Sequence, residues 1–393
     1  MTGSHQVAGN KITLLQNGTE YFPQLCADID AARQTIYLET YIFAADETGR
    51  MIADALRRAA TRGVKVHVVL DGYGSAELPP HWVDDLLTAG VGVRWFRREI
   101  SPFTLQSNRH RRLRRMHRKM AVMDGEVAFV GGINIINDIS TLSDMSSSHL
   151  DYAVRVQGAE AEEIQATMRH LWEVVTWASF RRRTNKLKWP DLVAKRHSTS
   201  PDIALVLRDN VRHRREIERA YLKAIVGAQR EIIIANAYFL PGRIFRRALI
   251  KAAKRGVRVV LLLQGKVEYW IQHYATHALY GELMGSGIEV YEYQASYLHA
   301  KVAVVDGLWA TVGSSNIDPF SLLLAREANL VIRDSKFAGE LRASLQVAIT
   351  NNAARIGDEY GRTLNLFGRM IAHLSYAVVR LLVGISRYRK RGT

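Results

Sequence analysis

The strongest constraint on the fold is a sequence pattern that occurs twice. Each copy has a histidine, a lysine two residues later, an Asp-Gly pair after an apolar segment, and small residues followed by an asparagine. The copies are His117-Arg-Lys119-Met-Ala-Val-Met-Asp124-Gly125 leading to Gly131-Gly132-Ile-Asn134, and His299-Ala-Lys301-Val-Ala-Val-Val-Asp306-Gly307 leading to Gly313-Ser314-Ser-Asn316. Because Asp-Gly between apolar segments is a strong hairpin signal, each copy predicts two antiparallel strands. The chain is therefore expected to contain two similar halves.

The predicted hairpins bring three types of side chain together in each half. A two-residue turn at Asp124-Gly125 pairs His117 with Gly132, and the equivalent turn in the second copy pairs His299 with Ser314. Side chains two residues apart on a strand share a face, so each histidine points the same way as the lysine that follows it. Each copy therefore predicts a cluster of His, Lys and Asn.

The aspartate of each copy is expected to stand apart from that cluster. Asp124 lies seven residues after His117, which is ~23 Å along an extended strand. Asp306 has the same spacing from His299. Both aspartates are therefore predicted to form the turns and to take no part in the chemistry.

These residue types suit an anion better than a metal ion. Metal sites combine His with carboxylates or thiolates, and a lysine ammonium opposes a cation. Lys and Asn can donate to phosphate oxygens, small residues let a phosphate approach, and His can act as nucleophile or as acid and base. The sequence predicts a phosphoryl-transfer site with no metal or other cofactor. Its residues are His117, Lys119, Asn134, His299, Lys301 and Asn316.

Both copies resemble the HxKxxxxD(x)6GGxN pattern of the phospholipase D superfamily, with Ser314 in place of the second Gly of the latter copy. The resemblance covers nearly the whole chain. Four further segments are similar to bacterial cardiolipin synthases of the B type, namely Arg114-Arg-Met-His-Arg-Lys119, Leu70-Asp-Gly-Tyr-Gly-Ser75, Ile234-Ala-Asn-Ala-Tyr238 and Ala310-Thr-Val-Gly-Ser-Ser-Asn316.

This resemblance implies a reaction and a role for each histidine. A phosphatidyl group passes from phosphatidylglycerol or phosphatidylethanolamine to the hydroxyl of phosphatidylglycerol through a phosphohistidine. His117 is implied to be the nucleophile and His299 the acid and base. Asp151 and Glu327, each on a strand that follows its motif, are implied to orient the histidines, whose second ring nitrogen needs an acceptor.

Outside the two motifs, apolar strand segments alternate with helical segments, which predicts an α/β layer structure. The strand segment 35–43 recurs as 231–239, and 63–72 recurs as 256–265. Together with the resemblance, this implies two phospholipase D-like α/β/α repeats related by a pseudo-twofold axis, with a C-terminal amphipathic helix. The expected boundaries are 1–180 for the first domain, 181–201 for a basic linker, 202–355 for the second domain and 356–393 for a membrane-associating segment.

A net charge of +16 over 393 residues predicts an anionic partner. Nucleic acid and an anionic membrane both fit, so a nuclease or DNA phosphodiesterase remains the alternative function. The C-terminal amphipathic segment favours lipid, because it has no role in a nuclease. The expected partners are an anionic phospholipid membrane, and phosphatidylglycerol with a second phospholipid as substrates.

Two basic segments are candidates for contact with that membrane. Strand segments recur 193 to 196 positions apart but the two histidines only 182, so the first half carries an insertion of about 13 residues just before His117. This arginine-rich insertion is expected to bind lipid head groups or to be a solvated loop. The C-terminal segment is expected to lie in the head-group plane or to dock on the protein. The arginines concerned are Arg109, Arg111, Arg112, Arg114, Arg115, Arg369, Arg380 and Arg387.

Three further observations bear on location. Residues 1–10 are polar and lack the apolar core of a signal peptide. The sequence has no uninterrupted apolar segment of the length that crosses a bilayer. Cys26 is the only cysteine, which excludes an intramolecular disulfide. The expected location is the cell membrane, peripherally bound on its cytoplasmic side.

Overall fold

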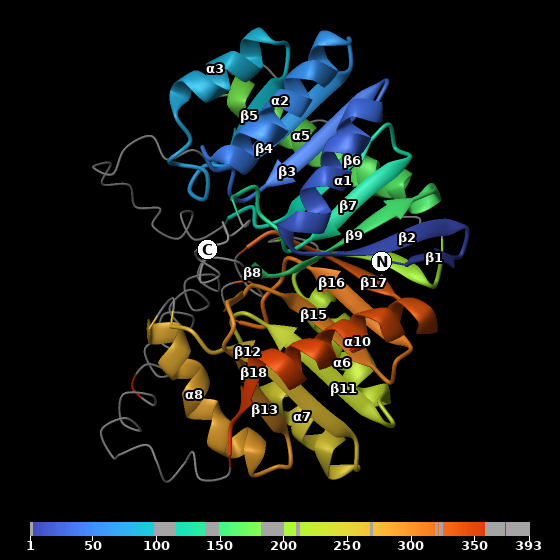
Figure 1. The fold of residues 1–393 in the computed structure, drawn as a ribbon, viewed down its shortest axis with the longest axis vertical. Coiled ribbons are helices and arrows are strands. Elements are labelled where there is room, and N and C mark those ends of the chain that lie inside the picture. Colours follow the sequence, from blue (N-terminus) through green and yellow to red (C-terminus); the bar gives the residue numbers. More distant parts are fainter. Residues whose placement is uncertain are drawn as a thin grey trace.

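The computed structural model describes residues 3–97, 115–137, 149–181, 200–209, 213–267, 270–318, 321, 325–357 and 374. Within these residues the strands form two eight-stranded sheets and one short two-stranded sheet (Figure 1). Several expectations lie outside the described residues: the C-terminal helix, most of the linker, and every head-group arginine except Arg115.

The first sheet combines a parallel part with an antiparallel part. Its strand order is β1-β2-β9-β7-β6-β3-β4-β5, in which β3, β4 and β5 run parallel. The bounds are β1 Ser4–Val7, β2 Asn10–Gln16, β3 Thr35–Thr40, β4 Lys65–Asp71, β5 Gly92–Phe96, β6 Lys119–Met123, β7 Val127–Gly131 and β9 Tyr152–Gln157. Helices α1 Asn17–Ala31, α2 Glu47–Thr61 and α3 Pro80–Thr88 pack on one face, and α5 Ala159–Arg181 packs on the other.

The second sheet repeats this arrangement, with the order β10-β17-β16-β15-β11-β12-β13-β18. The strands are β10 Ile203–Arg208, β11 Glu231–Asn236, β12 Arg258–Gln264, β13 Glu289–Tyr293, β15 Lys301–Val305, β16 Trp309–Gly313, β17 Glu327–Ile332 and β18 Ala353–Arg355. The helices are α6 Glu216–Gly227, α7 Arg243–Lys254, α8 Trp270–Met284 and α10 Ser335–Asn352. The predicted pair of similar α/β halves is therefore confirmed.

Local sequence signals explain where the helices begin and which face they bury. Asp46 caps α2 by accepting the amide of Gly49 at 2.8 Å, and Asp334 caps α10 by accepting the amide of Phe337 at 2.8 Å. Such caps satisfy amide groups that the first turn of a helix leaves free. In α2 the buried side chains, which include Ile52 and Leu56, follow helical spacing and face the sheet.

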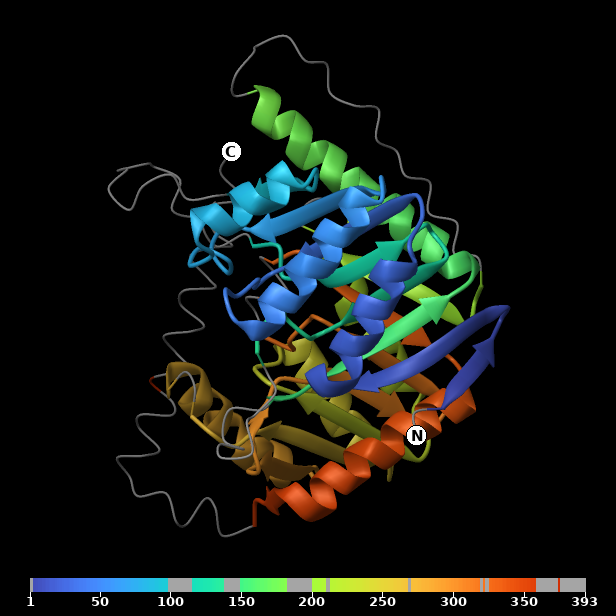
Figure 2. The ribbon, with the colours of Figure 1, turned by 45° about the horizontal axis from the view of Figure 1, so that its top comes forward.

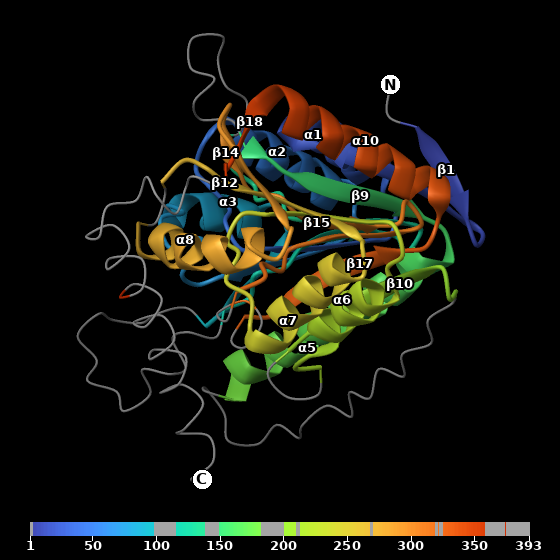
Figure 3. The ribbon, with the colours of Figure 1, turned by 90° about the horizontal axis from the view of Figure 1, so that it is seen from below.

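The two halves share a hydrophobic core. One continuous cluster joins Val122 and Val154 of the first sheet to Val304 and Leu330 of the second. Helix α10 of the second half also lies along β1 and β2 of the first half (Figures 2 and 3). The functional residues at the boundary of the halves are therefore held by a packed interface.

The register of each hairpin differs by one residue from the predicted one. Lys119 pairs with Gly131 and Met123 with Val127, so the turn contains three residues. Asp124 and Gly125 both have positive φ, 55° and 71°, and form the centre of the turn, but Glu126 is an extra residue outside the ladder. The prediction that His117 pairs with Gly132 was wrong, and the same shift applies to His299 and Ser314.

The motif aspartates hold these turns against the start of a neighbouring strand. The carboxylate of Asp124 accepts the backbone amides of Arg33, Gln34 and Thr35 at 2.7, 2.8 and 2.7 Å. Asp306 accepts the amides of residues 229, 230 and 231 in the same way. Each aspartate therefore ties its hairpin to the strand beside it.

We expect Asp124→Ala to lower the free energy of unfolding by about 2–4 kcal/mol, because three amides lose a charged acceptor. Urea denaturation measures this change. Asp124→Asn, which keeps one acceptor oxygen, should lose less and serves as the matched control. An unchanged unfolding free energy for the alanine variant would contradict this role.

Candidate active site

The two motif histidines are held where the halves meet, by backbone contacts that cross the boundary. The amide of His117 donates to the carbonyl of Arg326 at 2.9 Å, and the amide of His299 donates to the carbonyl of Leu150 at 2.9 Å. Arg326 directly precedes Glu327, and Leu150 directly precedes Asp151. Each histidine is thereby placed beside the carboxylate of the opposite half.

The side chains also contact each other across the boundary between the halves. Nδ1 of His299 lies 2.6 Å from Oδ2 of Asp151, and Nδ1 of His117 lies 3.2 Å from Oε2 of Glu327. Both carboxylates are buried. Because a carboxylate accepts a hydrogen bond from a protonated Nδ1, these contacts favour the tautomer whose Nε2 carries a lone pair. Each ring can then use Nε2 as a nucleophile or base.

Two lysines complete a buried set of charges around the histidines. Nζ of Lys119 donates to the carbonyl of His117 at 2.8 Å, and Nζ of Lys301 donates to the carbonyl of His299. Nζ of Lys301 also lies 4.0 Å from Oδ2 of Asp151. The structure therefore brings together the histidines, the lysines and the carboxylates that the sequence singled out.

Burial and mutual charge determine the protonation of this set. Burial and then the neighbouring lysines lower the pKa of both His117 and His299. Burial lowers the pKa of Lys119 to about 7. Burial also raises the pKa of Asp151 to about 6, whereas for Glu327 the interactions with His117 and Lys119 outweigh burial and lower the pKa. At neutral pH both imidazoles are neutral.

The two asparagines lie next to the site in different environments. Oδ1 of Asn134 accepts the amide of Ile42 at 3.3 Å. Asn316 is buried, and the atom placed as its Oδ1 has no hydrogen-bond partner among the described residues. Because the oxygen and nitrogen of an amide are assigned from their hydrogen bonds, this position can also present the NH₂ group to an anion.

Sequence reasoning missed two residues that position the histidines. Oδ2 of Asp71 accepts the amide of Met116 at 2.8 Å, and Oε1 of Gln264 accepts the amide of Leu298 at 3.0 Å. Met116 and Leu298 each directly precede a motif histidine. The available signal was that both acceptors are polar residues at the end of an apolar strand.

The position that is Gly in one motif and Ser in the other also differs in structure. At Gly132 a Cβ atom would overlap the carboxylate oxygens of Asp151, so only glycine fits. The hydroxyl of Ser314 instead donates to Oε2 of Glu327 at 2.6 Å. The same motif position therefore supports each carboxylate by a different means.

Other predicted site residues stand apart from this cluster. Asp124 and Asp306 are held at the hairpin turns by the backbone amides described above. Arg115, which precedes the first motif, places its guanidinium 4.7 Å from the ring centre of Tyr73. The other predicted membrane-binding arginines lie outside the described residues.

Comparison with known proteins is consistent with this geometry. The family model described as "Cardiolipin synthase, PLD-like domain" matches residues 25–172 and 221–348. Cardiolipin synthase B of Escherichia coli K12 is 42% identical over 355 residues, covering 89% of this chain and 83% of that protein. The major cardiolipin synthase of Bacillus subtilis is 31% identical, covering 84% of this chain and 67% of that protein. A crystal structure of phosphatidylserine synthase from Haemophilus influenzae shares the fold, with a TM-score of 0.68 at 14% identity, covering 97% of this chain and 95% of that one.

The lowered histidine pKa values give a testable prediction. At pH 7 the NMR signals of both motif histidines should be those of neutral rings protonated at Nδ1, and they should titrate only below the ordinary histidine pKa of about 6.5. Selectively labelled histidine, assigned with His117→Ala and His299→Ala, reports this directly. Imidazolium signals from either residue at pH 7 would contradict the assignment.

Proposed function

We propose that this chain, which belongs to the family of cardiolipin synthases with phospholipase D-like domains, uses its two motif histidines to transfer a phosphatidyl group through a phosphohistidine. The chain is a cardiolipin synthase and acts on phospholipids. The donor is phosphatidylglycerol or phosphatidylethanolamine, and the acceptor is the terminal hydroxyl of phosphatidylglycerol. The observation that carries the mechanism is the pair of histidines whose Nδ1 atoms each face a buried carboxylate.

In the first step Nε2 of His117 attacks the phosphorus of the donor. A bond forms between nitrogen and phosphorus while the bond to the head-group oxygen breaks, and that oxygen takes a proton from His299. Glycerol or ethanolamine leaves. In the second step His299 removes the proton from the acceptor hydroxyl, whose oxygen attacks phosphorus and releases His117.

The resemblance to the phospholipase D motifs gives the two histidines their roles. Asp151 lies 2.6 Å from His299, and Glu327 lies 3.2 Å from His117. Either carboxylate can stabilise the imidazolium form of the histidine that it faces. By resemblance we assign His299 as the acid and base and His117 as the nucleophile.

The remaining polar residues stabilise the phosphoryl oxygens. We assign Lys119, Lys301, Asn134 and Asn316 to donate to the negative charge that develops in each transition state. Asp151 and Glu327 orient the imidazoles. One phosphodiester bond is exchanged for another, so the reaction as proposed uses no nucleotide or metal.

We place the enzyme peripherally on the cytoplasmic face of an anionic membrane. The net charge of +16 supports attraction to anionic lipids. Among the described residues no helix has the length and apolar character needed to cross a bilayer. The arginine-rich insertion and the C-terminal segment are proposed to contact the head groups.

His117→Ala and His299→Ala should each lower cardiolipin formation from phosphatidylglycerol vesicles by about 10²–10⁴-fold, because each removes a covalent or proton-transfer step. Rapid acid-free quenching with labelled lipid should trap the labelled phosphatidyl group on His117 in the wild type. The label should be absent from His117→Ala, and His299→Ala should form it slowly.

His81→Phe, an exposed substitution on α3, is the control for general effects of mutation. Plasmid DNA incubated with the same preparation distinguishes the alternative function. Plasmid cleavage without cardiolipin formation, or full synthesis by either alanine variant, would contradict the proposal.

A further inference from the structure

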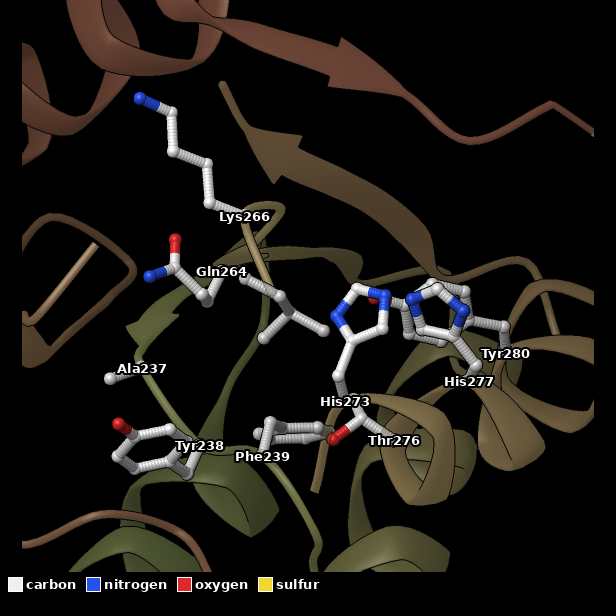
Figure 4. A pocket seen from close by; sticks show the side chains of 10 residues that line it. Ala237, Tyr238, Phe239, Gln264, Lys266, His273, Thr276, His277 and Tyr280 are labelled. Atoms are coloured by element: carbon white, nitrogen blue, oxygen red, sulfur yellow. The ribbon is translucent and has the colours of Figure 1, made fainter. Parts of the chain in front are cut away.

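The two halves differ beside their histidines. Tyr41 directly follows β3 in the first half, and its ring lies 4.7 Å from the ring of His117. Ala237 directly follows β11 at the equivalent place in the second half. The small side chain leaves a pocket lined by Tyr238, Gln264, Lys266, His273, Thr276 and His277 (Figure 4).

Hydrogen bonds connect residues that line this pocket to the segment that carries His299. The amide of Ala237 donates to the carbonyl of Ala300 at 3.0 Å, and Oε1 of Gln264 accepts the amide of Leu298 at 3.0 Å. These two partners are the residues on either side of His299. Since Tyr41 at the equivalent place lies beside His117, we expect the pocket to lie close to His299, the proposed acid and base.

The lining offers neutral hydrogen-bonding groups. Burial and then the adjacent His277 lower the pKa of His273 to about 4, so this ring is neutral and presents one donor and one acceptor. Gln264 and Thr276 contribute an amide and a hydroxyl. In Figure 4 the side chains of Gln264 and Tyr238 come from the strand side, and the two histidines come from α8.

The two charged groups near the pocket differ in their place: the carboxylate of Glu292 is held by lining residues, and Lys266 is itself part of the lining. Glu292, on β13 behind the two histidines, lies 2.9 Å from Nε2 of His277 and accepts the hydroxyl of Tyr280 at 3.0 Å. Lys266 places its ammonium 5.6 Å from the ring centre of Tyr297 and donates to the carbonyl of Ala295 at 3.4 Å. A cation in the lining suits a ligand that carries a phosphate beside its hydroxyl groups.

The pocket is small. Its free volume is about 20 Å³, and one water-sized group needs about 10–15 Å³ measured in this way. The lining as it stands therefore accepts a single hydroxyl group with its carbon and not a whole head group. The secondary hydroxyl of a glycerol has the right size and polarity.

We propose that this pocket is a polyol subsite that binds the secondary hydroxyl of glycerol while the reacting oxygen of the same glycerol faces His299. This inference rests on the proposed function. In both steps the alcohol oxygen that leaves or attacks phosphorus exchanges its proton with His299. The secondary hydroxyl is free both in the glycerol that leaves and in the phosphatidylglycerol head group that attacks. One subsite then serves both steps and favours glycerol over alcohols that lack further hydroxyls.

The test compares two alcohols as inhibitors of cardiolipin formation from phosphatidylglycerol vesicles by the full chain. Free glycerol should half-inhibit the wild type at a lower concentration than 1-propanol. In Thr276→Val and in His273→Phe, the half-inhibiting concentration of glycerol should rise about five- to ten-fold, the effect of one lost hydrogen bond. In the same variants the half-inhibiting concentration of 1-propanol should stay within about two-fold of the wild-type value. His81→Phe should change neither value.

Thr276→Val replaces a hydroxyl by a methyl group of similar size, so it keeps the test valid if the histidine variant folds poorly. The pocket assignment is overturned if the wild type does not distinguish the two alcohols, or if both variants keep the wild-type preference. It is also overturned if the half-inhibiting concentrations of glycerol and 1-propanol rise together in the variants. If wild type forms neither cardiolipin nor phosphohistidine, the proposed function itself has failed; if it forms both without glycerol preference, only the pocket assignment has failed.

Discussion

The rest of the site depends on one interaction, in which each motif histidine contacts a carboxylate of the opposite half. His299 of the second half faces Asp151 of the first at 2.6 Å, and His117 of the first faces Glu327 of the second at 3.2 Å. Backbone hydrogen bonds from both histidines cross the same boundary. Neither half contains a complete histidine–carboxylate pair. The shared core between the sheets therefore maintains the site as well as the fold, because separating the halves would break both pairs.

Burial of this charged set explains how the site prepares for an anionic substrate. Isolated buried charges are unfavourable, so the carboxylates and the lysines Lys119 and Lys301 stabilise one another. The histidines respond by remaining neutral, since burial and the lysines lower the pKa of each ring. A phosphodiester arriving between them adds negative charge and raises these pKa values again. In the proposed mechanism, the proton that His299 takes up when substrate binds is the proton needed by the leaving alcohol.

Much of the fold and the membership of the site could be predicted because the sequence repeats itself. Two matching motifs identified the histidines, lysines and asparagines, and the Asp-Gly pairs located the hairpins. The register was wrong because the extra residue Glu126 follows a turn of the expected type, and spacing alone does not reveal such a residue. The supporting acceptors Asp71 and Gln264 were missed because their partners are backbone amides 45 and 34 residues away. That each carboxylate serves the opposite half depends on how the halves pack, which neither copy of the motif encodes.

The symmetry of the halves is also incomplete in ways that suit two different roles. The ring of Tyr41 lies beside His117, whereas Ala237 at the equivalent place of the second half lines a pocket. The central claim, that each histidine depends on the carboxylate of the other half, is tested most directly by histidine NMR of two variants. Asp151→Asn should shift the ring nitrogen signals of His299 and leave those of His117 nearly unchanged, and Glu327→Gln should do the reverse. Perturbation of the histidine within the same half as the substituted carboxylate, with the other unaffected, would contradict the account.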